Sequence, residues 1–433
     1  MLKSHTRYRW LVVAVLFAFV LLHQADKLLI GPLTTPIMDT FGINEAQMGA
    51  VSMFAVLVQA LLYPVWGYLY DRFARSRLLA LASFLWGSTT WLNALAPTYR
   101  VFLVTRASTG IDDASYPGIY SLLSDYFGPR MRGRAYGLLQ IAQPLGFMLG
   151  TILATFLAAT LGWRNVFFVT GSAGILMSFV ILAAVREPRR GQAEPELAGL
   201  GELPVRRIDR ETVLRLLRNP SYLLLLTQGF FGVFPWQVLT FWFFRYLEAE
   251  RGYSPDEAMV TMIVAIATLS AGYFLGGTIG DFAFRRTPRG RALTSTAGVL
   301  AGAVLLVLTL SVPDTDRGTF MLLLGFTGVM MSMAAPNVVA IVHDVTEPEV
   351  RGTAQAVQYF AENIGSAVAP WLAGLIAVHY SLHTAILVLC VSTWLLCGLL
   401  FGATAVLVPR DIARLREILR ERAAEDGPSP AAS

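Results

Sequence analysis

The sequence predicts an all-α integral membrane protein with twelve transmembrane helices in two six-helix halves. Apolar residues make up 55% of the 433 residues and charged residues only 15%, and the mean hydropathy is +0.56. Apolar stretches of about 20 residues recur along the whole chain, and each is long enough to cross a hydrocarbon core of about 30 Å. An internal repeat, described below, divides these stretches into two sets.

The expected spans follow one another with short polar connections. The first six cover residues 10–33, 47–70, 78–96, 100–127, 134–160 and 164–185. The second six cover residues 220–247, 256–282, 292–312, 318–343, 353–378 and 383–407.

The distribution of basic residues predicts the orientation of these spans. With the N-terminus inside, 27 of the 34 Lys and Arg residues lie in inner segments, whereas the outer loops hold only Arg100, Arg164, Arg251 and Arg317. Cytoplasmic loops carry such an excess of basic residues. We therefore expect both termini in the cytoplasm of a multi-pass plasma (inner) membrane protein. The net charge of +5 reflects this topology and does not require a nucleic-acid partner.

Two cytoplasmic loops repeat each other. The loop after the fourth span is DYFGPRMRGRAYG, from Asp125, and the loop after the tenth is DVTEPEVRGTAQA, from Asp344. At a constant offset of 219 residues, the matching positions are Asp125, Pro129, Arg132, Gly133, Ala135 and Gly146 with Asp344, Pro348, Arg351, Gly352, Ala354 and Gly365. This agreement predicts two halves related by parallel repetition, as in one class of transporters.

The repeat sets the expected domain boundaries. We expect an N-terminal half at 1–185, a cytoplasmic linker at 186–219, a C-terminal half at 220–408 and a cytoplasmic tail at 409–433. The linker ends in DRETVLRLLR and the tail contains IARLREILRER. Both patterns are typical of amphipathic helices on the inner membrane surface.

A polar stretch interrupts the first span. The residues WLVVAVLFAFVLL precede, and LLIGPL follow, the stretch HQADK at 23–27. One Asp or Lys at the centre of a membrane helix costs about 2.5 to 3.5 kcal/mol on insertion-derived scales. Partners elsewhere in the chain must offset this cost.

Several motifs resemble one transporter family. The stretch GYLYDRFARSR, from Gly67, resembles the loop between the second and third helices of the major facilitator superfamily, and Arg106 followed by Gly110 is similar to its fourth-helix motif. HQADK resembles the Asn, Asp, Arg pattern of the Spinster lipid transporters, as do GIDDASY at 110–116 and VREPRRG from Val185. Lys27 replaces the usual Arg, Asp113 replaces the usual Glu, and the loop lacks its usual second glycine. The resemblance covers the whole chain and implies that the first and fourth helices flank a central cavity.

Helical spacing places the charged residues of these two spans on stripes. His23, Asp26 and Lys27 are three and four residues apart, so we expect them to share one side of the first span. The stripe on the fourth span consists of Arg106, Gly110, Asp113 and Pro117. If both stripes face the cavity that the resemblance implies, Asp26 and Lys27 meet Asp112 or Asp113 there. A purely structural buried ion pair is the alternative.

The choice of Lys27 favours proton coupling. The chain has 32 Arg and only two Lys, and a buried Lys can release its proton, whereas Arg effectively cannot. The adjacent acids Asp112 and Asp113 repel one another. We therefore expect a proton-coupling site in the cavity, formed by Asp26, Lys27, Asp112, Asp113, Arg106 and Glu362.

Further polar residues are candidates for the substrate cavity. These are His23, Gln24, Tyr116, Gln143, Gln355, Gln358 and Arg245. For the glutamines, hydrogen bonds that merely join helices are an equally good interpretation. Arg245 follows Trp242 and precedes Tyr246, so it can instead extend to the membrane interface.

The resemblance also implies a gate at the cytoplasmic side. Its residues are Gly67, Asp71, Arg72, Asp281, Arg132 and Arg351. We expect Asp71 and Asp281 to cap or pair with the cytoplasmic ends of neighbouring helices and to stabilise the state that is closed to the cytoplasm.

The motifs of several enzyme classes are absent from the sequence. It contains no Walker A loop, HExxH, GxSxG or Cys/His metal spacing. We therefore expect neither enzyme activity nor a cofactor or a metal. We expect a monomeric secondary transporter that works by alternating access, with protons, the lipid bilayer and a small-molecule or lipid-like substrate as partners. An amphipathic lysolipid-like anion is the favoured substrate. The alternatives are a small organic anion, a hydrophobic drug, or a membrane receptor that transports nothing.

Overall fold

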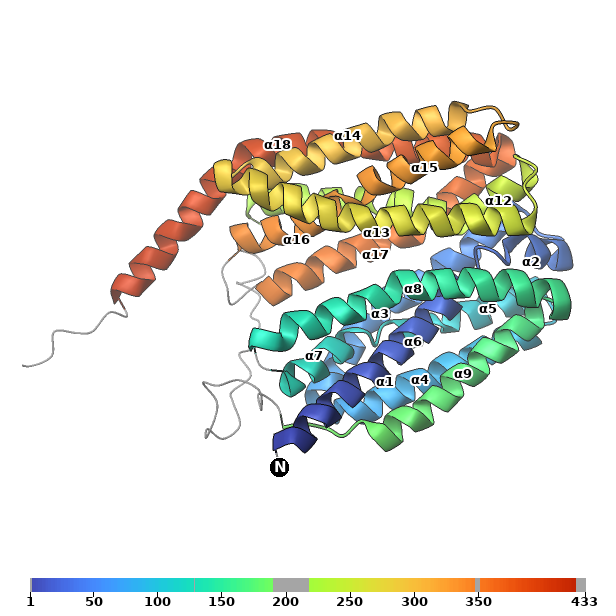
Figure 1. Ribbon diagram of the computed structural model, residues 1–433, viewed down its shortest axis with the longest axis horizontal. Helices are drawn as coiled ribbons and strands as arrows, with labels where there is room; N and C mark the ends of the chain where they lie inside the picture. The colour runs from blue at the N-terminus through green and yellow to red at the C-terminus, as the bar shows by residue number, and fades with distance from the viewer. Residues whose placement is uncertain (1, 128, 190–217, 347–350, 426–433) are drawn as a thin grey trace, which may run out of the picture. The chain divides into compact units, whose positions relative to one another are not determined.

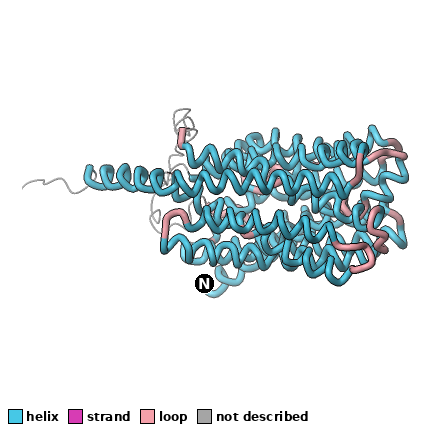
Figure 2. The backbone as a smooth tube through the Cα atoms, turned by 90° about the horizontal axis from the view of Figure 1, so that it is seen from above, coloured by secondary structure: helices cyan, strands magenta, loops and turns pink. Residues whose placement is uncertain are grey.

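A computed structural model describes residues 2–127, 129–189, 218–346 and 351–425 (Figure 1). Every regular element in these ranges is a helix, as the tube view shows (Figure 2). The first set of helices is α1 (Leu2–Leu28), α2 (Thr34–Phe41), α3 (Glu45–Arg72), α4 (Arg75–Leu95), α5 (Tyr99–Ser108), α6 (Gly110–Asp113), α7 (Pro117–Tyr126), α8 (Pro129–Leu161) and α9 (Trp163–Ala184). The second set is α11 (Pro220–Gly232), α12 (Phe234–Ala249), α13 (Pro255–Arg286), α14 (Gly290–Ser311), α15 (Arg317–Ser332), α16 (Ala334–Val345), α17 (Arg351–His379) and α18 (Leu382–Glu425).

The membrane spans agree with the predicted fold class. In the part of the chain that is described, eleven helical segments are long and apolar enough to cross a membrane. The expected span at 100–127 is not among them because it consists of three short helices, α5, α6 and α7. Pro117 begins α7, and because it has no N–H to donate it is well suited to the first turn of a new helix. The twelfth span therefore exists as a broken segment.

The helices form two compact units. Unit 1 comprises Met1–Val205, Gln237–Ile263 and Ser366–Ala385, and unit 2 comprises Arg206–Trp236, Val264–Gly365 and Ile386–Ser433. Parts of α12, α13, α17 and α18 thus belong to the same unit as the N-terminal helices. These units do not follow the sequence repeat, and the division at 186–219 stays a prediction.

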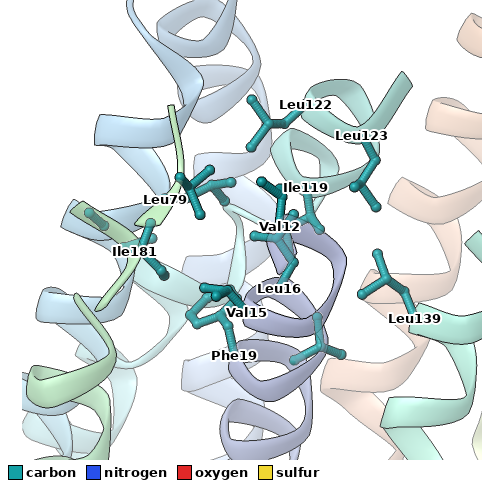
Figure 3. Close-up of a cluster of buried hydrophobic side chains, with 14 of the residues drawn as sticks. Val12, Val15, Leu16, Phe19, Leu79, Ile119, Leu122, Leu123, Leu139 and Ile181 are labelled. Carbon is teal, nitrogen blue, oxygen red and sulfur yellow. The ribbon is translucent and has the colours of Figure 1, made fainter. Parts of the chain in front are cut away.

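The core of unit 1 surrounds α1. Helix α1 packs against α8 and α9, and α9 also packs along α4. Figure 3 shows Val12, Leu16 and Phe19 of α1 within a buried cluster that includes Leu79 and Ile119. Close van der Waals packing of this kind is the main force between helices in lipid, where apolar burial alone gives little preference.

Two glycines of α8 let α1 approach closely at the HQADK stretch. A Cβ atom on Gly146 would lie 2.5 Å from the carbonyl oxygen of Leu21, and one on Gly150 would lie 2.3 Å from that of Ala25. Any side chain at either position would therefore overlap the backbone of α1. This contact fixes the position of residues 23–27 within unit 1.

Two sequence predictions concern the linker between the halves and the C-terminal tail. The predicted linker helix in DRETVLRLLR lies almost entirely outside the described residues. The predicted tail helix is present as a continuation of α18, which runs from Leu382 to Glu425 past Pro409.

We predict that Gly150→Ala destabilises unit 1. The added methyl group overlaps the Ala25 carbonyl, and overpacking of this kind typically costs about 1–3 kcal/mol. The midpoint of thermal unfolding, measured for the purified protein in detergent, should fall. Gly402→Ala on α18 is the matched control, because a Cβ there meets no atom within 4 Å. An equal midpoint for both variants would contradict this account of the α1–α8 contact.

Candidate functional site

Four side chains from α1 and α6 form an ion-pair network inside unit 1. Lys27 Nζ lies 3.1 Å from Asp113 Oδ2. His23 Nε2 lies 2.9 Å from Asp112 Oδ2 and 3.5 Å from Asp113 Oδ1. We call these four residues, His23, Lys27, Asp112 and Asp113, the mid-membrane network. It joins the polar stretch of the first span to the two acids of the broken fourth span.

Burial differs across the mid-membrane network. His23 and Asp112 are 3% and 2% exposed, whereas the Lys27 side chain is 30% exposed. Lys27 also donates a hydrogen bond to Gln59 Oε1, at 3.3 Å, and Gln59 in turn donates to the hydroxyl of Tyr63. Lys27, the accessible cation of the network, therefore contacts the buried acid Asp113 on one side and the neutral amide of Gln59 on the other.

Close backbone packing also fixes the acidic side of the network. A Cβ atom on Gly110, the first residue of α6, would lie 2.2 Å from the carbonyl oxygen of Ala55 on α3. The indole of Trp66 donates to the Ile111 carbonyl at 2.6 Å, and the Tyr70 hydroxyl donates to the Ser115 carbonyl at 2.9 Å. Side chains of α3 thus satisfy carbonyl groups of the broken segment, as the membrane interior requires.

Asp26 faces a different direction from Lys27. Its carboxylate accepts hydrogen bonds from the hydroxyls of Thr90 on α4, at 3.0 Å, and Thr170 on α9, at 2.5 Å. Neighbouring residues on a helix point about 100° apart, which separates the two side chains. Sequence spacing placed His23, Asp26 and Lys27 on one side of the span, but the structure brings only His23 and Lys27 to the acids of α6.

Arg106 supports the end of α1. Its Nη2 donates to the Lys27 carbonyl oxygen at 3.1 Å, and its guanidinium lies 6.0 Å from the centre of the Phe167 ring. The side chain is 5% exposed. Sequence reasoning gave Arg106 the task of holding Asp113 or a substrate anion. In the described structure its hydrogen-bond partner is instead the backbone next to the polar stretch.

The mid-membrane network could be mistaken for a metal site. One ligand atom from each of His23, Asp112 and Asp113 lies within 4.8 Å of the others. The ammonium of Lys27 already supplies a positive charge to Asp113, and the 2.9 Å separation of His23 and Asp112 is that of a hydrogen bond. We therefore treat the group as a hydrogen-bonded ion-pair network.

Sequence reasoning missed several residues of this site. Gln59, Thr90 and Thr170 hydrogen-bond its charged groups, and the rings of Trp86 and Tyr116 lie 5.2 and 5.4 Å from that of His23. Tyr116 alone had been named as a candidate. These residues were hard to identify from the sequence, because a lone amide or hydroxyl group within an apolar span more often forms its hydrogen bond within its own helix.

The expected residues of the later spans make contacts of their own. In unit 2, Gln358 Nε2 donates to the Leu225 carbonyl at 3.2 Å and to Glu362 Oε1 at 3.1 Å, so this glutamine joins α17 to α11. Gln355 is half-buried, and Gln143, in unit 1, is exposed. Gln24 is half-buried beside Gly146.

Arg245 has an acidic partner. Its Nη2 lies 3.0 Å from Glu45 Oε1, and its Nη1 donates to the Thr35 hydroxyl at 3.4 Å. Thr35 also donates to Glu248 at 2.9 Å. All of these residues belong to unit 1. The guanidinium therefore pairs within the protein, whereas the sequence suggested either a substrate contact or extension to the membrane interface.

Arginine–carboxylate clusters lie at helix ends in both units. In unit 1, Arg75 at the start of α4 lies 2.6 Å from Asp125 and 2.8 Å from Glu187. In unit 2, Arg291 near the start of α14 pairs with Asp281 at 2.6 Å and with Asp344. Asp125 and Asp344 are partners in the sequence repeat. The sequence thus marked both acids, but it did not identify Arg75 or Arg291 as their partners.

The expected gate residues are only partly covered by the structure. Asp281 pairs with Arg291, consistent with the expected link to a neighbouring helix end. Gly67 is exposed, and Arg72 donates to the Tyr68 hydroxyl at 2.6 Å. The side chains of Asp71, Arg132 and Arg351 lie outside the described part of the chain.

We predict that Arg75→Ala strongly destabilises unit 1. Asp125 would remain buried without its cation, and breaking such a pair typically costs about 3–5 kcal/mol. Thermal unfolding in detergent measures the effect. Arg72→Ala removes an exposed arginine from the same loop and should leave the unfolding midpoint nearly unchanged. Equal midpoints for both variants would show that the Arg75 cluster adds no stability.

Comparisons with known proteins bear on these features. A family model described as Major Facilitator Superfamily matches residues 15–318 and 290–430. The chain is 30% identical over 395 residues to protein spinster of Drosophila melanogaster, which covers 88% of this chain and 64% of that protein. It is 28% identical over 388 residues to protein spinster homolog 1 of Homo sapiens, covering 85% of this chain and 72% of that protein.

A more distant relative and a solved structure extend the comparison. An MFS-type efflux pump of Mycolicibacterium smegmatis is 26% identical over 383 residues, covering 86% of this chain and 85% of that protein. The crystal structure of a bacterial homolog to the human lysosomal transporter Spinster, inward-facing and unoccupied, matches with a TM-score of 0.77 at 20% identity, covering 98% of this chain and 99% of that one. This likeness supports the fold. The chain belongs to the Major Facilitator Superfamily of membrane transporters, and within it the chain is Spinster-like.

Proposed function

We propose that this protein is a proton-coupled secondary transporter that moves an anionic, lysolipid-like amphiphile across the plasma membrane by alternating access. The observation that carries the proposal is the Lys27–Asp113 ion pair in the middle of the apolar spans, with Lys27 partly accessible. Charges at this depth are costly and in membrane proteins typically mark ion and substrate pathways. We also propose a monomer with both termini in the cytoplasm.

The ion pair suggests how a proton gradient drives transport. Lys27 is bound by Asp113, while the neighbouring carboxylate of Asp26 is bound by two threonine hydroxyls. Protonation of Asp113 would free Lys27 to pair with another anion, either Asp26 or a substrate. If the two pairings favour opposite-facing states, protons shift the population between them. In this scheme Asp26 and Asp113 are the proton-responsive acids and Lys27 is the cation that they exchange.

The proposed substrate class follows from charge and from the relatives. Lys27 offers a cation to an anionic head group, and the surrounding spans are apolar enough to accept an acyl chain. The Spinster resemblance supports a lipid-like substrate. The similarity to an efflux pump favours a hydrophobic drug as the second candidate. A small organic anion, transported by symport, is the third.

We predict that Asp26→Asn abolishes accumulation driven by a pH gradient but retains part of the gradient-free substrate exchange. Lys27→Arg should retain substrate binding and alter the pH profile of transport, because Arg effectively cannot release its proton. Both variants are measured in liposomes with an imposed pH gradient, with labelled lysophospholipid as substrate.

The control is Asp39→Asn, which removes an exposed carboxylate from α2. It should transport like the wild type. Gradient-driven accumulation that persists in Asp26→Asn would remove Asp26 from the coupling mechanism. Sugar acids and cationic dyes, screened in the same liposomes, test the other substrate classes, and the absence of flux for every compound would favour the receptor alternative.

A further inference from the structure

The charges of the N-terminal six spans do not balance within the membrane. Away from the ends of these spans, the charged residues are Asp26, Lys27, Arg106, Asp112 and Asp113. The three acids and two bases leave one negative charge. The histidine beside these acids is His23, whose Nε2 contacts both Asp112 and Asp113.

Among the described residues, no other positive charge contacts His23. Segments 78–95, 135–161 and 165–184, which belong to α4, α8 and α9, contain no charged residue. The groups that face the imidazole are the Trp86 and Tyr116 rings and the two acids of α6. On α1 itself, Asp26 turns away toward its two threonines, and Lys27 reaches Asp113. Arg106 is engaged with the Lys27 carbonyl.

Both charge states of His23 are compatible with this site, and each carries a cost. A neutral imidazole that donates from Nε2 to Asp112 leaves the mid-membrane network with an uncompensated negative charge. An imidazolium neutralises the network, but it leaves a buried Nδ1–H that has no hydrogen-bond partner in the structure. Because neither form is fully satisfied, a change in nearby charge can move the proton on or off.

The network also places His23 and Lys27 on the same acid. Lys27 Nζ contacts Oδ2 of Asp113, and His23 Nε2 lies 3.5 Å from Oδ1 of that carboxylate. The partly exposed Lys27 can leave Asp113 for another anion, whereas the buried His23 cannot. Departure of Lys27 removes one positive charge from Asp113, and a proton on His23 replaces it.

We infer that His23 takes up one proton when an anionic substrate draws Lys27 away from Asp113. This inference rests on the proposed transport function and adds to it one proton, held by His23, for each substrate anion bound. The neutral imidazole donates from Nε2 to Asp112, so this proton binds at Nδ1, and no covalent bond is made or broken in the substrate. The proton on His23 is separate from those that the proton-responsive acids Asp26 and Asp113 bind.

A first experiment tests the inference without a substrate. Lys27→Met mimics departure of the ammonium, and Asp113→Asn removes the shared acid. Solid-state NMR of ¹⁵N-histidine in liposomes distinguishes imidazole from imidazolium, and His23→Gln identifies which of the five histidine signals belongs to His23. In Lys27→Met, the pH at which His23 is half converted should rise by about one unit or more. In Asp113→Asn it should fall.

Arg72→Met is the matched control, because it removes an exposed cation whose contacts within the described part of the chain are with Tyr68. It should leave the His23 signal unchanged. If the half-conversion pH of His23 is the same in Lys27→Met as in the wild type, the inference is overturned. Lys27→Met and Asp113→Asn are expected to shift the half-conversion pH of His23 in opposite directions, so either variant tests the inference if the other fails to fold.

A second experiment measures protons taken up on binding. Isothermal titration of lysophosphatidylglycerol into the protein in nanodiscs, repeated in buffers of different ionisation enthalpy, gives the number of protons bound per ligand. We expect about one proton more per ligand for the wild type than for His23→Gln. Binding to the wild type without proton uptake would overturn the inference. If lysophosphatidylglycerol does not bind, the proposed substrate class fails, and the NMR experiment still decides the role of His23.

Discussion

The ion pair between Lys27 and Asp113, deep in an apolar bundle, imposes a constraint on the surrounding unit. Neither charge is tolerable alone at this depth, and both come from spans that would otherwise be ordinary membrane helices. The pairing therefore fixes the distance and rotation of the first span relative to the fourth. His23 and Asp112 are buried beside this pair and share a hydrogen bond.

Backbone packing makes this arrangement possible. Gly146 and Gly150 allow α8 to press against α1 at the polar stretch, and Gly110 allows α6 to press against α3. The break between α6 and α7 occurs immediately after Asp112 and Asp113, where the turn and Pro117 interrupt the regular helix. Irregular backbone at membrane depth is tolerated only where protein or a water-filled cavity surrounds it, and the hydrogen bonds from Trp66 and Tyr70 provide such surroundings.

A second set of charges serves another purpose. Arg75 and Arg291 each bind an acid at the end of a later helix of the same unit, and those acids, Asp125 and Asp344, occupy equivalent positions of the repeat. Both clusters lie at helix ends, where charges are less costly than at the membrane centre. Their arrangement stabilises the junctions between helices and is separate from the mid-membrane network.

The sequence by itself determined the fold class, the expected spans and the residues that had to be explained. Apolar length and the repeat are local properties of the chain, so they could be read without a structure, and the insertion cost of charge singled out residues 23–27, 112 and 113.

Only the tertiary structure decided the partners of these charged residues. Helical spacing gives the angle between Asp26 and Lys27, but it does not show which of the two faces the acids of the fourth span. It also cannot show that Thr90 and Thr170 lie opposite Asp26. Nor could it show that Arg106 holds a backbone carbonyl, because that contact depends on how the helices pack together, which no single span encodes.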